Sequence, residues 1–256
     1  MDYALGFLIA TAIGLTGVGG GTLTTPLLIL LLGVPAPEAV GTSLLFVTFS
    51  KILATPVYLL RGQVDRRIAG LLLLGGLPGV VVGSLTLARM RSARLEPIVL
   101  TIVGATVAIV ACVGLWKLLH SHVSGTRELP KASRERWLPW LAAPIGMEVG
   151  FSSAGAGALG TLLLLECATL NTGAVVGTDL LFGLIISAVG GGLHLALGGV
   201  NRVLVLHLCV GGAAGAALGA WLGSWLPARP LRTALTAFLV FLGGQLTWRG
   251  LQALMR

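Results

Sequence analysis

Six apolar segments, each about as long as a membrane-spanning helix requires, dominate this 256-residue chain. They follow one another with short polar connections, and a chain built this way has more apolar surface than a water-soluble globule can bury. The sequence therefore predicts an all-α polytopic membrane protein. The segments are Gly41 to Leu60, Ile68 to Ala88, Pro97 to Leu119, Gly173 to Gly198, Val203 to Leu226 and Leu231 to Leu251.

The charged residues are too few to cover a soluble globule. They make up 10% of the chain, whereas soluble domains carry roughly a quarter. The net charge of +8 does not indicate nucleic acid, because the basic residues form short clusters between apolar runs, where the positive-inside rule places them. We expect the lipid bilayer as a partner, no nucleic-acid partner, and a location in the cytoplasmic membrane.

Two other apolar regions are interrupted by glycine. Ala4 to Leu32 contains the stretch Thr16 to Gly21, and Trp137 to Ala168 contains the stretch Gly150 to Gly157. Each region predicts two short helices joined by a non-helical loop at membrane depth. Such a loop is tolerated only where protein buries it or where it lines a cavity.

The chain repeats itself. A shift of 136 residues aligns Gly14 to Leu95 with Gly150 to Leu231 without a gap, giving 23 identities in 82 pairs. A polar stretch between the copies predicts a linker. We therefore predict a first membrane repeat over 1–119, a cytoplasmic linker over 120–136 and a second repeat over 137–256, each repeat having a broken helix pair and three membrane-spanning helices.

The relative orientation of the repeats is left open by the loop charges. Lys and Arg divide 10 against 6 between the two sides for inverted repeats, and 11 against 5 for parallel repeats. Both arrangements place the linker in the cytoplasm. We favour inverted repeats, because in secondary transporters they give two symmetry-related gates with the site at the broken helices.

This arrangement resembles the sulfite exporter TauE/SafE family, also called the TSUP family, over nearly the whole chain. The first half carries the family pattern in Gly14 to Gly21, Leu23, Pro26, Leu27, Gly33 and Gly41-Thr42-Ser43-Leu44, and the second in Gly177-Thr178-Asp179 and His194. The resemblance implies transport of sulfite, sulfonates or other sulfur-containing anions. The second loop departs from the glycine triplet of the first, with Ala154 and Ala156 between its glycines.

The glycine loops are the predicted anion site. Glycine lets backbone N–H groups converge, and the short helix expected to begin near Thr22 adds the partial positive charge of its N-terminus. The alternative is close helix packing around glycine. The predicted substrate-binding residues are Gly17, Gly19, Gly20, Gly21, Thr42, Ser43, Lys51, Ser152, Ser153, Gly155, Gly157 and Thr178.

Three ionisable residues inside apolar segments are candidates for a functional role. Lys51 is near mid-depth and is expected to attract the anion, facing a carboxylate such as Asp179, Glu166 or Glu148. Asp179 and His194 are the predicted proton-coupling residues. The alternatives are a structural ion pair for Lys51, a helix cap for Asp179 and a hydrogen-bonded packing residue for His194.

The sequence thus predicts a secondary transporter for a small anion, with alternating access by rocking of the halves and with protons as a possible coupling ion. The main rival is an anion channel; an intramembrane enzyme and a membrane scaffold are weaker alternatives. We find no catalytic constellation, metal-ligand spacing or nucleotide-binding motif, so we expect no enzyme activity, no metal and no cofactor. Substrate, direction and oligomeric state are left open.

Overall fold

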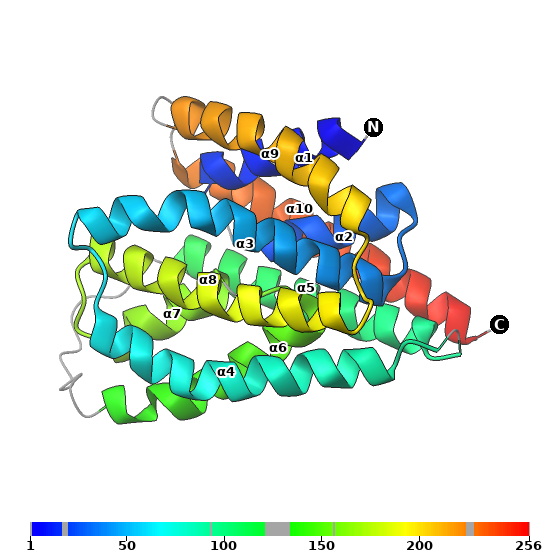
Figure 1. The fold of residues 1–256 in the computed structure, drawn as a ribbon, viewed down its shortest axis with the longest axis horizontal. Coiled ribbons are helices and arrows are strands. Elements are labelled where there is room, and N and C mark those ends of the chain that lie inside the picture. The colour runs from blue at the N-terminus through cyan, green and yellow to red at the C-terminus, as the bar shows by residue number, and fades with distance from the viewer. Residues whose placement is uncertain are drawn as a thin grey trace.

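The computed structural model describes residues 2–16, 20–92, 94–120, 134–155, 157–223 and 228–255, which form a bundle of helices without strands (Figure 1). The helices of the first half are α1 (Asp2–Thr16), α2 (Gly20–Leu32), α3 (Ala36–Leu60), α4 (Arg66–Arg89) and α5 (Glu96–His120). The second half has the 3₁₀ turn η2 (Glu135–Trp137), then α6 (Leu138–Ser152), α7 (Ala158–Cys167), α8 (Thr172–Ala196), α9 (Arg202–Gly223) and α10 (Ala228–Leu254).

Within the described residues each predicted membrane segment corresponds to one helix, and four of these helices are long and apolar enough to cross a membrane: α3, α4, α5 and α8. Within the described residues α9 is apolar over the shorter stretch Arg202–Ala216. Exposed tryptophans lie near helix ends, with Trp116 and Trp140 on α5 and α6 and Trp248 on α10. Tryptophan prefers the membrane–water interface, so these positions agree with helices crossing a bilayer along the long axis of the molecule.

Each predicted broken segment contains two separate helices in the described residues, and residues 17–19 of the first lie outside them. α1 ends at Thr16 and α2 begins at Gly20, two residues before the predicted start at Thr22, and α6 ends at Ser152 with α7 beginning at Ala158. Neither α2, with 13 residues, nor α7, with 10, reaches the roughly 20 residues of a membrane crossing. Each pair is therefore made of helices that stop within the bundle.

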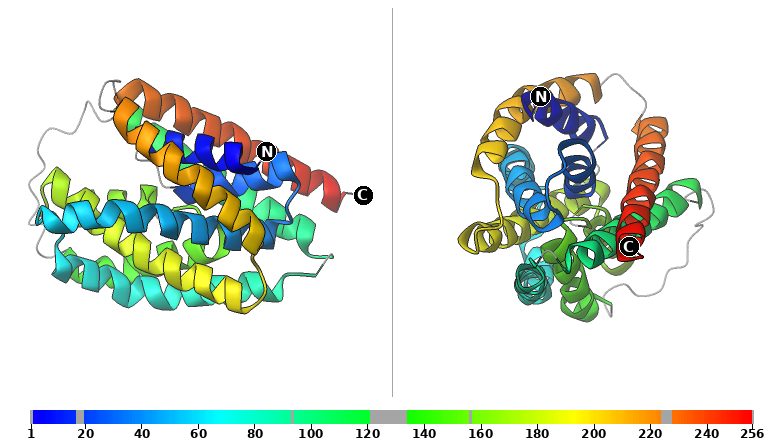
Figure 2. Two further views of the ribbon diagram at one scale, coloured as in Figure 1. Left: turned by 45° about the horizontal axis from the view of Figure 1, so that its top comes forward. Right: turned by 90° about the vertical axis from the view of Figure 1, so that its right-hand side faces the viewer.

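The helices of one half pack against helices of the other. α4 lies along α6, and α1 lies along α9, in the closest helix pairs of the bundle, together with α5 along α10 (Figure 2). A methyl group on Gly75 or Gly79 of α4 would lie 1.7 or 2.2 Å from backbone oxygens of α6. On α9, a methyl on Gly211 or Gly215 would lie 2.0 or 2.2 Å from backbone oxygens of α1. Glycine is required at these places because backbone meets backbone.

Each of these contacts has an equivalent between the other pair of helices, at positions 136 residues apart in the sequence. Gly75 faces Pro139, and the positions equivalent to these two, Gly211 and Tyr3, face each other as well. The connections between helices follow the same rule. The Asp65 N–H donates to Thr178 Oγ1 at 3.0 Å, and the equivalent Asn201 N–H donates to Thr42 Oγ1 at 3.2 Å.

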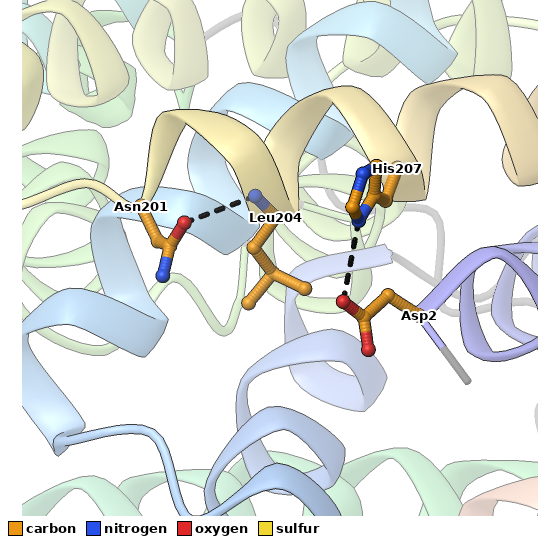
Figure 3. A network of polar contacts seen from close by, with 4 residues as sticks. All are labelled: Asp2, Asn201, Leu204 and His207. Carbon is orange, nitrogen blue, oxygen red and sulfur yellow. Dashed lines mark hydrogen bonds and ion pairs between the residues drawn. The ribbon is translucent and has the colours of Figure 1, made fainter.

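Asp65 and Asn201 also begin the next helix in each half. Asp65 Oδ1 accepts from the N–H of Ile68, and Asn201 Oδ1 accepts from the N–H of Leu204, each at 3.0 Å (Figure 3). These N-caps satisfy backbone donors that a helix start leaves free. Close to Asn201, the Asp2 carboxylate pairs with His207 at 3.3 Å and holds the start of α1 against α9.

α3 and α8 lie side by side at the centre and run in opposite directions: in Figure 1, α3 runs from right to left and α8 from left to right. They also carry most of the buried polar side chains, including Thr42, Ser43 and Lys51 on α3 and Thr178 and Asp179 on α8. The broken segments approach this central pair, with α2 against α3 and α7 against α8. The fold thus concentrates buried polarity where helices end inside the bundle.

Candidate functional site

The loop between α6 and α7 has an unusual backbone. Ser153 has a φ of 61°, and it is the one residue other than glycine with a positive φ in the described part of the chain. It caps α6, with its N–H donating to Val149 O at 2.8 Å. Left-handed backbone costs a residue with a side chain about 1–2 kcal/mol. Such a conformation persists when surrounding contacts hold it, and it is often found at functional sites.

The contacts of Ser153 join the two broken segments. Its Oγ lies 2.5 Å from Thr25 Oγ1 on α2, 3.2 Å from the carbonyl oxygen of Gly21, and 3.1 Å from Ser43 Oγ on α3. We call Thr25, Ser43 and Ser153 the hydroxyl cluster. All three side chains are fully or almost fully buried. The start of α2 therefore touches the end of α6 through hydroxyl groups that can rotate to donate or accept.

Gly21 is the point of closest approach between the two segments. A methyl group there would lie 1.8 Å from the backbone oxygen of Ser153. Gly20 faces the opposite way, since a methyl group on it would lie 3.0 Å from the side chains of Ile13 and Val47. The two neighbouring glycines therefore differ: Gly21 borders the hydroxyl cluster, and Gly20 has the packing environment of the alternative interpretation.

A second polar group lies on the other side of the loop. Ser152 Oγ accepts from the N–H of Ala154 at 3.1 Å and donates to Glu148 Oε1 in a short hydrogen bond. Glu148 Oε2 is buried with no hydrogen-bond partner. A methyl group on Gly155, whose φ is 85°, would lie 2.3 Å from this oxygen. The loop thus closes tightly around a carboxylate.

The third polar group is the charged one. Asp179 on α8 lies beside the first turn of α7, where Thr161 Oγ1 donates to its Oδ2 at 3.0 Å. Its Oδ1 is buried without a partner, 2.1 Å from where a methyl on Gly160 would be. Lys51 on α3 interacts electrostatically with Asp179, although no ion pair within 4.0 Å forms between them.

Lys51 itself makes no hydrogen bond to the described residues, and 7% of its surface is exposed. A buried ammonium group has three donors and a full charge, and leaving them without acceptors costs several kcal/mol. Of the carboxylates named as possible partners from the sequence, Asp179 is the one that faces it. The site thus holds a cation that a bound anion could satisfy.

Other predicted site residues make contacts outside these three groups. Thr42 and Thr178 accept backbone N–H groups of the connections described above, and Gly157 precedes α7 as its N-terminal flanking residue. Gly17 and Gly19 lie outside the described residues. His194 Nε2 lies 3.0 Å from the carbonyl oxygen of Gly150, and this hydrogen bond matches the packing alternative.

The sequence interpretation did not single out Thr25 and Thr161, and it treated Glu148 only as a partner for Lys51. One signal was available for the threonines: they are an identical pair in the repeat alignment. For Glu148 the signal was a carboxylate inside an apolar run. Both signals point to polar groups that a membrane helix retains at a cost.

The groups at the broken segments are of kinds that bind negative ligands. Hydroxyl groups lie at the starts of α2 and α7, and both hydroxyl donors and helix starts favour a negative ligand. Within the described residues no group of three His, Cys, Asp or Glu side chains could hold a metal ion. The described pockets lie at the end of the bundle near Arg91 and Asn201, away from the hydroxyl cluster.

Comparison with known proteins agrees with this description. The family model described as "Sulfite exporter TauE/SafE" matches residues 3–246. The chain is 27% identical to the probable membrane transporter protein YjnA of Bacillus subtilis (strain 168) over 244 residues, covering 93% of this chain and 96% of that protein. A probable membrane transporter protein of Xylella fastidiosa (strain 9a5c) is 32% identical over 114 residues, 44% of this chain and 43% of its own. No solved structure matches the chain.

The family match spans nearly the whole chain. Both relatives, one similar over most of the chain and the other over less than half of it, are named as membrane transporters. The helical bundle has several helices able to cross a membrane, and its buried polarity gathers at two broken segments. The chain is therefore a multi-pass membrane transporter that belongs to the sulfite exporter TauE/SafE family.

Proposed function

We propose that the protein is a secondary transporter that moves a small anion across the cytoplasmic membrane by alternating access. The observation that carries this proposal is the contact of the two broken segments at Ser153, close to the buried central helices that carry Lys51 and Asp179. In secondary transporters, broken helices at matching positions of two halves form the substrate site. The hydroxyl cluster, the starts of α2 and α7, and Lys51 would together bind the anion.

The substrate class follows from charge and from the family. A negative ligand gains from the helix starts, each worth about 0.3–1 kcal/mol, and more from a buried ammonium group. The family description names sulfite, so we propose a sulfur-containing anion such as sulfite, a sulfonate or a related organosulfur anion. Oxyanions of this kind have several acceptor oxygens that could bind hydroxyl donors from both broken segments at once.

Asp179 is the proposed proton-coupling residue. Its ionised carboxylate lies beside α7 and interacts with Lys51. In this state the carboxylate competes with a substrate anion for the positive charge of Lys51. Protonation would remove the negative charge of the carboxylate and leave Lys51 available to the substrate. An anion and a proton would then favour each other's binding. His194 was the other candidate, and its hydrogen bond to Gly150 makes it the weaker of the two.

The proposed transport cycle uses inverted repeats. One observation supports this orientation: α3 and α8, which are equivalent helices in the two repeats, run in opposite directions. The halves would be residues 1–119 and 137–256, joined by a cytoplasmic linker over 120–136. Each end of the bundle would then carry an equivalent gate, one for each orientation of the site.

The test is uptake by purified protein in liposomes. Sulfite, thiosulfate, sulfonates and carboxylates are offered with and without an imposed pH gradient. We expect saturable uptake of at least one sulfur anion, acceleration by a proton gradient, and exchange of labelled for unlabelled substrate. Conductance without exchange would identify a channel instead. Absence of uptake for the whole panel in both directions would reject the proposal.

A further inference from the structure

We propose that Glu148 is a second proton-binding site, and that its proton decides whether the α6–α7 loop can donate hydrogen bonds to the substrate anion. This inference rests on the proposed function and deepens it, since it assigns a regulating ligand, the proton, to a carboxylate beside the same loop. The proton would be taken up at Oε2, which is buried and unpartnered.

The first step concerns the donors of the loop. The Ala154 N–H donates to Ser152 Oγ, and Ser152 donates in turn to Glu148 Oε1. Ser152 and Ala154 are completely buried, so neither group has water as an alternative partner. While Glu148 is ionised, the Ser152 hydroxyl is therefore committed to the carboxylate, and the Ala154 N–H is committed to the Ser152 oxygen. A substrate anion would have to displace this chain of two hydrogen bonds to use either donor.

The second step concerns the free oxygen. Glu148 Oε2 lies against the backbone at Gly155, where the left-handed φ of 85° and the missing side chain allow close approach. No described group donates a hydrogen bond to it. A buried carboxylate oxygen without a donor is costly in the charged form, and a proton removes that charge without requiring space for a larger ion.

The third step concerns the neighbouring charges. α6 packs against α4, α5, η2, α7 and α8, and α3 lies beyond α8. On α8, Asp179 is engaged with Thr161 and His194 with Gly150, and Lys51 on α3 faces Asp179. The remaining charged or titratable groups on the packed elements are Arg66, Arg67 and Arg89 on α4, Glu96, Cys112, Lys117 and His120 on α5, Glu135 and Arg136 on η2, and Glu166 and Cys167 on α7. The polar contact that the structure gives Glu148 is the one with Ser152.

These steps link the two ligands. Protonation of Glu148 weakens its hold on the Ser152 hydroxyl, which together with the Ala154 N–H then becomes available to an anion beside Ser153. Binding of the anion must favour proton uptake by the same factor. For one linked proton, the apparent Kd of the anion rises by up to about tenfold for each pH unit in the range where Glu148 ionises.

The test measures equilibrium binding of labelled thiosulfate and of methanesulfonate to purified protein at a series of pH values from acidic to neutral. The charge of these probes is constant over that range. Glu148→Gln, a neutral isostere of the protonated acid, should bind the probe more tightly than wild type at neutral pH. Its pH dependence should be smaller than that of wild type, and the part that remains is the part due to Asp179. Glu38→Gln, which neutralises a carboxylate in the first turn of α3, should keep the wild-type dependence and serves as the control.

Ser152→Ala provides a second variant in case Glu148→Gln does not fold. It removes the hydroxyl that links carboxylate and loop, so the pH dependence should fall in this variant as well. A wild-type pH dependence in either folded variant would overturn the role of Glu148 and leave the proposed function intact. Failure of wild type to bind either probe at any pH would count against the proposed function, and this inference would fall with it.

Discussion

The two broken segments occupy equivalent places in the repeat and differ in the chemistry around them. In the first half, the start of α2 faces hydroxyl groups, those of Ser43 and of Ser153 from the other half. In the second half, the start of α7 faces the carboxylate of Asp179, which stands at the repeat position of Ser43. One segment is bordered by neutral groups that can donate or accept, and the other by an acceptor that belongs to the protein.

The same division holds for the other buried ionisable groups. The repeat position of Lys51 is Ser187, and that of Glu148 is Ala12. The glycine contacts and the helix caps, by contrast, occur in both halves. The comparison teaches that the duplicated sequence retains its backbone scaffold in two copies, while its buried charges are present in single copies. The scaffold and the charges can therefore be tested separately.

The largest effect is expected from Gly21→Ala. The added methyl would meet the Ser153 backbone oxygen at 1.8 Å, and backbone cannot move aside as a side-chain end can. We expect loss of anion uptake and a destabilisation of about 1–3 kcal/mol, measured as a lowered melting temperature in detergent. Gly20→Ala, which meets side-chain ends at 3.0 Å, is the matched control. Equal and mild effects of the two would show that contact between the broken segments is not needed.

Lys51→Met removes the single-copy cation and keeps the length of the side chain. An ionised partner in a hydrogen bond contributes about 1.5–3 kcal/mol, so anion affinity should fall by roughly 10–100-fold, as a binding isotherm would show. Helical content should be retained, because Lys51 has no direct ion pair to lose. Unchanged affinity would remove Lys51 from the proposed site.

Asp179→Ser places a serine in the second half, where the equivalent position of the first half has Ser43. If the carboxylate competes with substrate for Lys51, this variant should bind the anion at least as tightly as wild type, while uptake no longer responds to an imposed proton gradient. The reciprocal variant Ser43→Asp should weaken binding. The measurement is liposome uptake with and without the gradient. Gradient-driven uptake at the wild-type rate in Asp179→Ser would contradict coupling through this residue.

The smallest effects are expected at the two equivalent connections. Thr178→Val removes the acceptor of the Asp65 N–H, and Thr42→Val removes that of the Asn201 N–H. A part-buried hydrogen bond contributes about 1 kcal/mol, so both variants should lower stability by similar amounts and leave anion affinity unchanged. A large loss of affinity in either variant would support the direct substrate contact first predicted for these threonines.

Much of the fold could be predicted from the sequence because its causes are local. Apolar runs of helix length, glycine breaks and the repeat register depend on residues close in the chain, and they placed the helices and both broken segments. Asp179 was one of three carboxylates named as possible partners of Lys51, because a buried cation near mid-depth needs a carboxylate, and it is the one that interacts electrostatically with Lys51.

The partners within the site could not be predicted in the same way. Sequence spacing does not show that Ser153 turns to α2 and α3 while the adjacent Ser152 turns back to Glu148, because this depends on the left-handed backbone at Ser153. Nor does it separate Gly20 from Gly21, whose surroundings come from helices far apart in the chain. Both distinctions are made by tertiary contacts across the repeat.

The glycine contacts between α4 and α6, and between α1 and α9, have a consequence for how such a molecule can move. With backbone against backbone, these pairs have no side chains between them that could rearrange, and interfaces of this kind shift as units. The first half of the chain supplies one member of each pair and the second half supplies the other. A rigid body in a transport cycle would therefore be a composite of both halves, and the mechanical units of the protein would cut across the boundary left by its gene duplication.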